Sequence, residues 1–251
     1  MAQQPTTVTV AAVTHHGRVR HSNEDCVLVG GWASVGDGNL TQQFTLAKAH
    51  PLLVAVLDGM GGHDGGDVAS RVAAAVLAAT PAVTGTEELR ERVLAADRAL
   101  LRAASPLQLA GMGTTVVGFL LGTDDYTVFN VGDSSAFRLL HGRLGHLSVT
   151  DGRPDPRRPG ATVLTQVLGG TVTELEVHQE TYPVGAPVRL LLCSDGLTYV
   201  VQPEQARELL GAVNPEQAAA ALLEAALDGG GPDNISVVVV DLDPQPEEFS
   251  R

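Results

Sequence analysis

Residues 52–70 read LLVAVLDGMGGHDGGDVAS, and they place an aspartate at the end of an apolar run. The run from Leu52 to Leu57 is short, apolar and bounded by a proline and a glycine, which predicts a buried strand. Five glycines follow Asp58 within eight positions, before a helical pattern begins at Asp67. Because glycine has no Cβ, this segment leaves open space around the carboxylate that the strand delivers.

Short strands are predicted along most of the chain, and several of them follow one another directly. Direct strand-to-strand connections indicate antiparallel pairing. Two such sheets packed together, with helices outside, would account for the nearly continuous apolar strands. The expected fold class is therefore α+β, with one domain over residues 8–242 and a frayed acidic tail at 243–251. The predicted strands begin with TVTVAAVTHHG and continue at 27–30, 52–57, 114–121, 126–131, 136–140, 175–182, 188–193 and 235–242.

The predicted helices fall into two groups along the sequence, one before residue 114 and one after residue 193. Pro203 and Pro215 suit first helical positions, and Asn214 with Gln217 matches a capping box. The polar, glycine-rich segment 30–50 is expected to form a hairpin or a loop. The predicted helices cover residues 67–79, residues 87–103 and two segments between residues 193 and 235.

Composition narrows the class of protein. The chain has 251 residues, is 44% hydrophobic and carries a formal net charge of -13. This indicates a globular chain and argues against binding nucleic acid or an anionic membrane, which needs a basic face. The two cysteines, Cys26 and Cys193, make no disulfide framework or zinc site and are interpreted as buried small hydrophobes. No apolar run approaches the ~20 residues of a membrane span, and signal-peptide features are lacking, so a cytoplasmic protein is expected.

Acidic residues stand at the ends of several predicted strands. Asp58, Asp133 and Asp195 each follow a strand, and Asp233 just precedes one. An antiparallel strand starts where its neighbours finish, so all four acids are expected at one rim, where the pair Glu24-Asp25 could join them. Taken singly, each Asp-Gly is more often only a turn. Like charges held together, however, need a cation among them.

Such a cluster predicts a centre for hard metal ions. Oxygen ligands select magnesium, manganese or calcium over zinc. Two ions ~3.5–4 Å apart can share a water and stabilise an in-line displacement at phosphorus. Arg20 is the candidate phosphate ligand because its planar guanidinium can bind two phosphate oxygens, and Arg18 is its rival.

Six motifs occur in an order that matches a known family. They are RVRHSNED (18–25), VLDGMGGHDGGDVAS (56–70), GMGTT (111–115), VGDSSAF (131–137), LLLCSDGL (190–197) and GGPDNISVVVV (230–240). In these motifs the chain resembles the metal-dependent Ser/Thr protein phosphatases, the PPM family or protein phosphatase type 2C group, in its bacterial-type branch. The resemblance spans about residues 8–242; GTT alone is weak, whereas DGMGGH with SDGL and DN in order is specific.

The resemblance implies a four-layer α-β-β-α sandwich of two antiparallel sheets flanked by helices. It also implies two manganese or magnesium ions per chain in a cleft at one sheet rim. Asp58 would bridge both ions, the Gly59 carbonyl would bind one of them, and Asp195 and Asp233 would bind the other.

Further positions match residues of the family that act beside the metals. Glu24 and Asp25 match an acidic pair that reaches the ions mainly through water. Arg20 matches the phosphate-binding arginine, and Asp133 matches the acid that helps to hold a third, weaker ion. Asn234 matches a residue beside the last ligand and is interpreted as a positioner.

The sequence departs from the family pattern around the cleft. Met60 stands where animal members carry a histidine proposed as the general acid, and His63 is close by. Ser135 stands where an arginine is common. The flap between Asp151 and Leu164 is short, and Gln166 takes the place of the arginine in the family's LTR-x-LG-like segment. Segment 30–50, by contrast, is enlarged. Substrate choice is therefore the least transferable property.

The expected function is hydrolysis of phosphoserine or phosphothreonine in proteins, by attack of a water bound to two metal ions. The expected partners are phosphoproteins of a Ser/Thr kinase, with no nucleic acid and no membrane, and the chain is expected to be a monomer. Two alternatives are a catalytically silent relative that binds phosphoproteins and a stress- or sporulation-type phosphatase acting on an anti-sigma-factor antagonist. A non-enzymatic calcium protein is disfavoured because the 12-residue loop of calcium-binding hands is absent.

Overall fold

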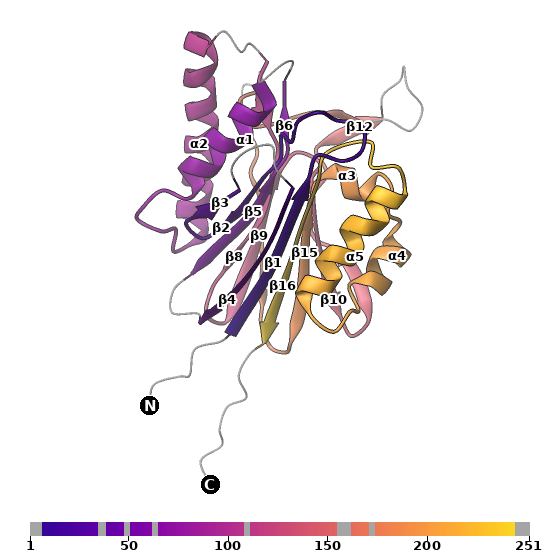
Figure 1. Ribbon diagram of the computed structural model, residues 1–251. Coiled ribbons are helices and arrows are strands. Elements are labelled where there is room, and N and C mark those ends of the chain that lie inside the picture. The colour runs from indigo at the N-terminus through magenta and orange to yellow at the C-terminus, as the bar shows by residue number, and fades with distance from the viewer. Residues whose placement is uncertain are drawn as a thin grey trace.

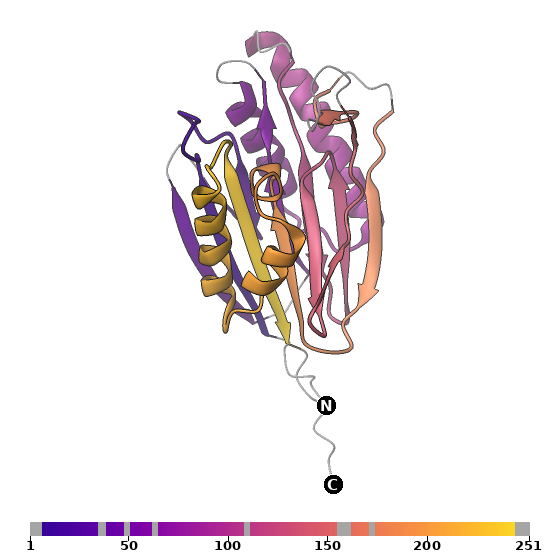
Figure 2. The same ribbon diagram turned by 90° about the vertical axis from the view of Figure 1, so that its right-hand side faces the viewer.

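The computed structural model describes residues 7–34, 39–47, 51–61, 65–107, 111–154, 162–170 and 174–243. Its elements form four layers, with two sheets face to face and helices on both outer faces (Figure 1). Figure 2 shows the same sandwich turned by 90°. The predicted α+β fold with two antiparallel sheets is confirmed. Most of the proposed tail, 244–251, lies outside the described residues.

One sheet holds both ends of the described chain. It has six strands in the order β11-β10-β15-β16-β1-β4, all antiparallel. The long strand β1 pairs along its length with β16, from Thr7 opposite Asp243 to His15 opposite Ile235. The bounds are β1 Thr7–His15, β4 Leu40–Ala47, β10 Ser135–Leu140, β11 Arg143–His146, β15 Val188–Cys193 and β16 Ile235–Asp243.

The second sheet also has six antiparallel strands, in the order β14-β9-β8-β5-β2-β3. Two short ribbons, β6-β7 and β12-β13, stand apart from both large sheets. The bounds are β2 Cys26–Val29, β3 Trp32–Ala33, β5 Leu52–Leu57, β8 Val116–Leu121, β9 Asp125–Val131 and β14 His178–Pro183. Those of the ribbons are β6 Gly59–Met60, β7 Gly113–Thr114, β12 Gly152–Pro154 and β13 Thr162–Leu164.

Helices cover the outer face of each sheet (Figure 1). The side chain of Asn214 accepts a hydrogen bond from the Gln217 amide, as the predicted cap requires, and Pro215 begins the last helix. A one-turn helix that the sequence analysis did not predict begins at Asp195. The bounds are α1 Gly65–Leu77, α2 Thr86–Leu107, α3 Asp195–Thr198, α4 Pro203–Leu209 and α5 Pro215–Asp228.

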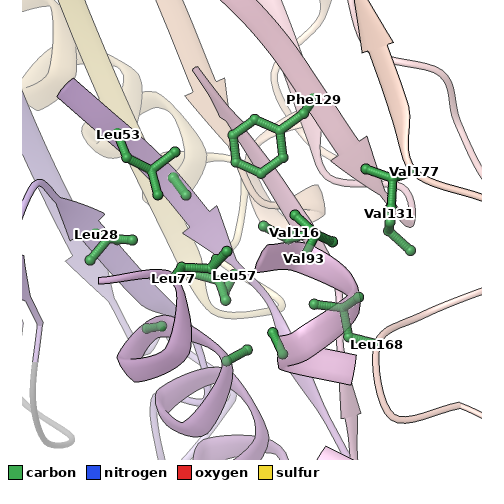
Figure 3. Close-up of a cluster of buried hydrophobic side chains, with 14 of the residues drawn as sticks. Leu28, Leu53, Leu57, Leu77, Val93, Val116, Phe129, Val131, Leu168 and Val177 are labelled. Carbon is green, nitrogen blue, oxygen red and sulfur yellow. The ribbon is translucent and has the colours of Figure 1, made fainter. Parts of the chain in front are cut away.

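Three apolar clusters hold the four layers together. One lies between α1, α2 and the second sheet, and includes Leu57, Leu77, Val93 and Phe129 (Figure 3). Another fills the space between the sheets, and a third lies under α4 and α5. Since strands of both sheets are covered on both faces, they carry apolar residues at nearly every position.

Two sequence-based expectations need correction. Residues 40–47, expected as loop or hairpin, form the edge strand β4, whose Phe44 and Leu46 pack between the sheets while Thr41, Gln43 and Thr45 alternate with them. Such alternation is what a strand with one solvated face requires. The strand expected from Leu175 begins only at His178, because Leu175 and Val177 pack into the cluster beneath α1 and α2 instead.

Candidate metal centre

A cavity of about 400 Å³ opens at the rim of the two sheets, at the end where the acidic strand ends meet. Among the described residues, its wall carries a single arginine, Arg20. The remaining charged side chains that line it are Glu24, Asp58, Asp133, Asp195 and Asp233. The predicted convergence of strand-end acids is therefore what the fold produces.

Each of these acids arrives from a different element. Asp58 follows β5, and Asp133 lies in the turn after β9. Asp195 opens helix α3 directly after β15, and Asp233 lies two residues before β16. Glu24 precedes β2. Antiparallel order places the ends of β5 and β9 at the same rim as the start of β2, and the end of β15 at the same rim as the start of β16. Because the two sheets pack face to face, these two rims meet at the cavity.

Crowding raises the proton affinity of these carboxyls. Burial raises the pKa of Asp58 well above its usual range, and the charges of Asp25, Asp195, Asp133 and Asp233 raise it further. The pKa of Asp195 is raised by burial and then by Asp233, against a hydrogen bond with Asp58 that lowers it. Repulsion of this kind marks a place where a cation would stabilise the charged forms.

Asp133 stands slightly apart from the others. Burial, followed by the charge of Asp195, raises its pKa to about 6, and Asp151 contributes in the same direction. Asp133 lines the cavity and therefore belongs to the same electrostatic cluster.

Asp25 is the acid that lies deepest. It is 7% exposed, and burial raises its pKa to about 7, with Asp195 and Asp233 contributing. The Ser194 hydroxyl donates to its Oδ2 at 2.8 Å, and the Ser236 amide donates to the Ser194 hydroxyl at 2.9 Å. Its Oδ1 is buried without a hydrogen-bond partner among the described residues. A buried carboxylate oxygen in this state is suited to a water or ion in the centre.

Asn234 fixes the loop that carries the acidic pair. Its Oδ1 accepts from the Glu24 amide at 2.8 Å, and its Nδ2 donates to the carbonyls of Ser22 and His16 at 2.8 and 3.1 Å. All three polar contacts go to backbone, so this side chain acts as a positioner, as its place in the sequence suggested.

The glycines after Asp58 allow close packing against Glu24. A Cβ added to Gly66 would lie 2.0 Å from Glu24 Oε2, and one added to Gly59 would lie 2.5 Å from the Glu24 carbonyl and 2.2 Å from that of Gly66. Gly66 is in the first turn of α1. The carboxylate of Glu24 thus reaches the N-terminal turn of a helix, where negative charge is favoured.

The two candidate arginines point to different places. Arg20 Nη2 lies 2.8 Å from Asp233 Oδ2 at the cavity. Arg18 Nε instead donates to the Leu227 carbonyl at the end of α5, and its Nη2 lies 3.8 Å from Asp228. Of these two arginines, Arg20 is therefore the one placed to meet a phosphate in the cavity.

Two residues of the GTT motif, Thr114 and Thr115, hold Asp58, a role that was not predicted from the sequence. Thr115 donates its amide to the Asp58 carbonyl at 2.9 Å, while the Asp58 amide donates to Thr115 Oγ1 at 3.1 Å. Thr114 Oγ1 also donates to that carbonyl. The GTT motif was the signal for these contacts, whereas nothing near Ser194 in the sequence signalled its contact with Asp25.

Other predicted positions are less involved. Met60 lines the cavity and is 39% exposed, but a thioether has no proton to donate. His63 lies outside the described residues. Leu164, at the end of the short β12-β13 ribbon, supplies an apolar part of the wall.

The donor set suits hard divalent ions. Among the described residues, no three carboxylate, imidazole or thiol groups stand close enough to hold one ion by themselves. The acids come from separate elements, so ions between them would also take water and backbone carbonyls such as that of Gly59, which lines the cavity. Carboxylate, carbonyl and water are the ligands of magnesium and manganese.

Comparison with known proteins agrees with this chemistry. A family model described as Protein phosphatase 2C matches residues 37–228. The serine/threonine phosphatase stp of Listeria monocytogenes is 32% identical, over 92% of this chain and 94% of its own length. The serine/threonine protein phosphatase PstP of Mycobacterium tuberculosis is 32% identical over 96% of this chain, which spans 46% of that relative's length.

Solved structures give the same result for the fold. A crystal structure of the catalytic domain of PstP in complex with two manganese ions superposes with a TM-score of 0.77 at 32% identity. The alignment covers 94% of this chain and 99% of that one.

Proposed function

This chain belongs to the protein phosphatase 2C family, the metal-dependent serine/threonine phosphatases, and we propose that its active centre is the acidic cavity at the sheet rim. The family uses two divalent ions, manganese or magnesium. The observation that carries the assignment is the convergence of Asp58, Asp195 and Asp233 beside Arg20 in one cavity.

In this proposal Asp58 would contribute to the binding of both ions. It has the most crowded carboxyl, facing the charges of four other aspartates. The Gly59 carbonyl would hold one ion, and Asp195 and Asp233 would hold the other. Glu24 and Asp25 would act through water. Asp133 would help to hold a third, weaker ion.

The remaining groups orient the substrate. When bound, the two ions supply the activated water and the positive charge that phosphoryl transfer requires. Arg20 holds the phosphate oxygens, since a guanidinium binds such oxygens in pairs. Asn234 and Ser194 keep Glu24 and Asp25 in place through the contacts described above.

The substrates we propose are phosphoproteins of a Ser/Thr kinase, and the proposed state is a cytoplasmic monomer. No helix within the described ranges is long and apolar enough to cross a membrane. An anti-sigma-factor antagonist as the substrate is the second candidate, favoured by the short β12-β13 ribbon where larger family members carry a flap.

The experiment that tests the proposal is hydrolysis of an aryl phosphate and of phosphothreonine peptides with manganese, with magnesium and with chelator. We expect turnover that requires added metal. A thiol-alkylating reagent should leave turnover intact, because Cys26 and Cys193 are buried and burial raises the pKa of both thiols, to about 11 for Cys26. Turnover that resisted chelator but was lost on alkylation would refute a metal mechanism. A chain with no turnover in any metal would be the silent relative.

A further inference from the structure

The side chain of Asp151 joins three separate segments beside the metal cavity. It is 9% exposed. Its Oδ2 accepts from the Gly132 amide and from Gln166 Nε2, both at 2.8 Å, and its Oδ1 lies 2.8 Å from His178 Nε2. A carboxylate offers about four acceptor positions, and three are used here.

The backbone of Asp151 repeats two of these connections. Its amide donates to the Gly132 carbonyl at 2.9 Å, and its carbonyl accepts from the Thr165 amide at 2.9 Å. Gly132 is the residue before Asp133, while positions 151 and 165 flank the β12-β13 ribbon on both sides. Asp151 therefore ties the Asp133 turn to both ends of the ribbon.

The turn at Gly132 and Asp133 depends on its contact with Asp151 because the backbone conformation at Gly132 is constrained. Gly132 has a φ of +105°, and a Cβ there would lie 2.7 Å from the Cβ of Thr115. Its amide is buried against Asp151, and a buried amide without an acceptor costs free energy. Two hydrogen bonds with Asp151, at 2.8 and 2.9 Å, hold this turn. A further contact comes from Ser134 Oγ, which lies 2.7 Å from Thr115 Oγ1.

Gln166 extends the clamp to the edge strand of the second sheet. Its Nε2 donates to the Glu176 carbonyl at 2.9 Å, and its Oε1 accepts from the Glu176 amide at 3.0 Å. The side-chain amide of Gln166 thus pairs with the backbone of Glu176, two residues before β14. The first residue of β14, His178, contacts Asp151. The ribbon, the edge strand and the Asp133 turn thus share one buried carboxylate.

We propose that Asp151 is a positioning residue, which sets the place of the Asp133 carboxylate and so the occupancy of the metal position that Asp133 borders. The inference rests on the proposed function. Partners that orient a ligand from behind typically change metal affinity about 10- to 100-fold when removed. Asp151 itself lies outside the set of residues that line the cavity.

Asn130 provides a matched control on the same two segments. Its Nδ2 donates to the Val149 carbonyl at 2.6 Å, and its Oδ1 accepts from the Val149 amide at 3.0 Å. It is buried like Asp151 and holds the chain two residues earlier, but these bonds do not reach Gly132. Asn130→Ala should therefore lower Tm without altering the metal position.

The test compares Asp151→Ala with Asn130→Ala in two readouts. The first is amide hydrogen exchange of the metal-free proteins, in which Asp151→Ala should expose residues 131–135 more than Asn130→Ala does. The second is manganese binding, which is measured by calorimetry and by the manganese dependence of aryl phosphate hydrolysis. Asp151→Ala should need about 10- to 100-fold more manganese to fill the weakest position, and Asn130→Ala should match the parent.

Two further variants keep the result decisive. Asp151→Asn retains one acceptor oxygen and should fall between the parent and Asp151→Ala, which covers the case in which the alanine variant fails to fold. In an Asp133→Ala background, Asp151→Ala should cause no further change in manganese dependence. Equal exchange and equal manganese dependence in Asp151→Ala and Asn130→Ala would overturn the proposal. If the parent protein does not hydrolyse phosphate esters, the proposed function fails, while exchange and calorimetry still decide the role of Asp151.

Discussion

Arg20 and Asp233 form an ion pair at the mouth of the metal cavity, with Arg20 Nη2 2.8 Å from Asp233 Oδ2. The two side chains are 53% and 36% exposed, so the pair contributes little to stability. Its consequence is positional. One bond orients the guanidinium toward the proposed ions and leaves further N–H groups of its planar fork to meet a phosphate.

Arg20→Ala should weaken phosphate binding while leaving metal affinity nearly unchanged. Loss of a hydrogen bond to a charged group costs about 1.5–3 kcal/mol, or about ten- to a hundredfold in binding. The expected result is a KM raised by that factor, and a phosphate inhibition constant raised equally, with half-maximal manganese as in the parent. Steady-state kinetics with an aryl phosphate and inorganic phosphate measure both.

Arg18→Ala is the control for this change. Its guanidinium caps the end of α5 through the Leu227 carbonyl and faces away from the cavity. KM should therefore stay at the parent value, with at most a small loss of Tm. If KM rose in Arg18→Ala but not in Arg20→Ala, the phosphate-binding residue would be Arg18, and the assignment to Arg20 would be wrong.

Asp58→Asn should be the most damaging single substitution at the centre. Its carboxyl faces Asp25, Asp195, Asp133 and Asp233, so its loss would weaken both ions, whereas Asp233→Asn would weaken mainly one. The loss of activity in Asp58→Asn should not be accompanied by a lower melting temperature in the absence of metal. Removing one charge relieves repulsion, so Asp58→Asn should melt no lower than the parent in chelator. An Asp58→Asn protein with parental turnover at limiting manganese would contradict the bridging role.

The core strands and the rim of acids could be predicted from sequence because their signals are local. Val188–Cys193 is an apolar run interrupted only by Arg189, and its bounds were predicted correctly. Asp58, Asp195 and Asp233 each stand at one end of a strand. Antiparallel order places Asp195 and Asp233 at the same rim of one sheet, and packing of the two sheets face to face brings Asp58 to that rim. Strand β4 was missed because LTQQFTLA reads as polar unless one knows that it lies at a sheet edge.

Contacts between distant segments could not be predicted in the same way. Asp25 and Ser194 are 169 positions apart, and nothing near either residue signals that they meet. The choice between Arg18 and Arg20 likewise depends on where α5 ends, since the Leu227 carbonyl captures Arg18. The role of Asp151 depends on Gly132, Gln166 and His178 at once.

The metal-free protein should lose stability as pH rises. The folded chain binds a proton more tightly than the unfolded chain at Asp25, with a pKa of about 7, and at Asp133, with a pKa of about 6, against an unfolded value near 3.8. The folded state therefore holds more protons, and the free energy of unfolding falls as pH increases from about 4 to about 7.

Calorimetry in chelator across that range measures the effect. Asp25→Asn lacks one of the two groups, so the Tm of the parent should fall relative to this variant as pH rises. Manganese should reduce the fall, because an ion that binds only the folded chain stabilises it by mass action. If the Tm of the parent rose relative to that of Asp25→Asn over the same range, the folded chain would stabilise the charged Asp25 carboxylate without metal, and the prediction would be wrong.

Gly66→Ala should damage the centre, whereas Gly65→Ala should not. A Cβ at Gly66 would lie 2.0 Å from Glu24 Oε2, so the carboxylate must move. At Gly65 the nearest atom is the Met112 Cβ at 3.3 Å, which a small shift accommodates. Both changes favour helix α1 by up to about 1 kcal/mol, so stability alone does not separate them.

Manganese titrations of the two glycine variants provide the comparison. We expect Gly65→Ala to bind manganese and turn over like the parent. Gly66→Ala should need more manganese for half-maximal rate, since Glu24 loses its place beside the first turn of α1. Parental manganese dependence in Gly66→Ala would show that Glu24 does not act on the ions from this position.

The last prediction concerns the third ion, on the side of the cavity that the β12-β13 ribbon borders. The ribbon has three residues in each strand, and Leu164 at its end places an apolar side chain in the cavity wall. An apolar group offers no ligand, so among the described residues on this side Asp133, together with water, would have to hold the ion. We therefore expect two tightly held manganese ions and a third that binds weakly. Residues 155–161, which include Pro156 and Pro159, lie outside the described part of the chain.

Asp133→Ala tests this expectation directly. It should leave two tight ions in calorimetry and reduce turnover mainly at low manganese, with recovery as the concentration rises. The short ribbon should also leave the cavity open, so small aryl phosphates should be accepted readily, with little discrimination among short phosphopeptides. Three equally tight ions in the parent would contradict the argument. So would strong peptide selectivity that disappears when segment 151–163 is shortened, because the ribbon would then supply ligands or substrate contacts.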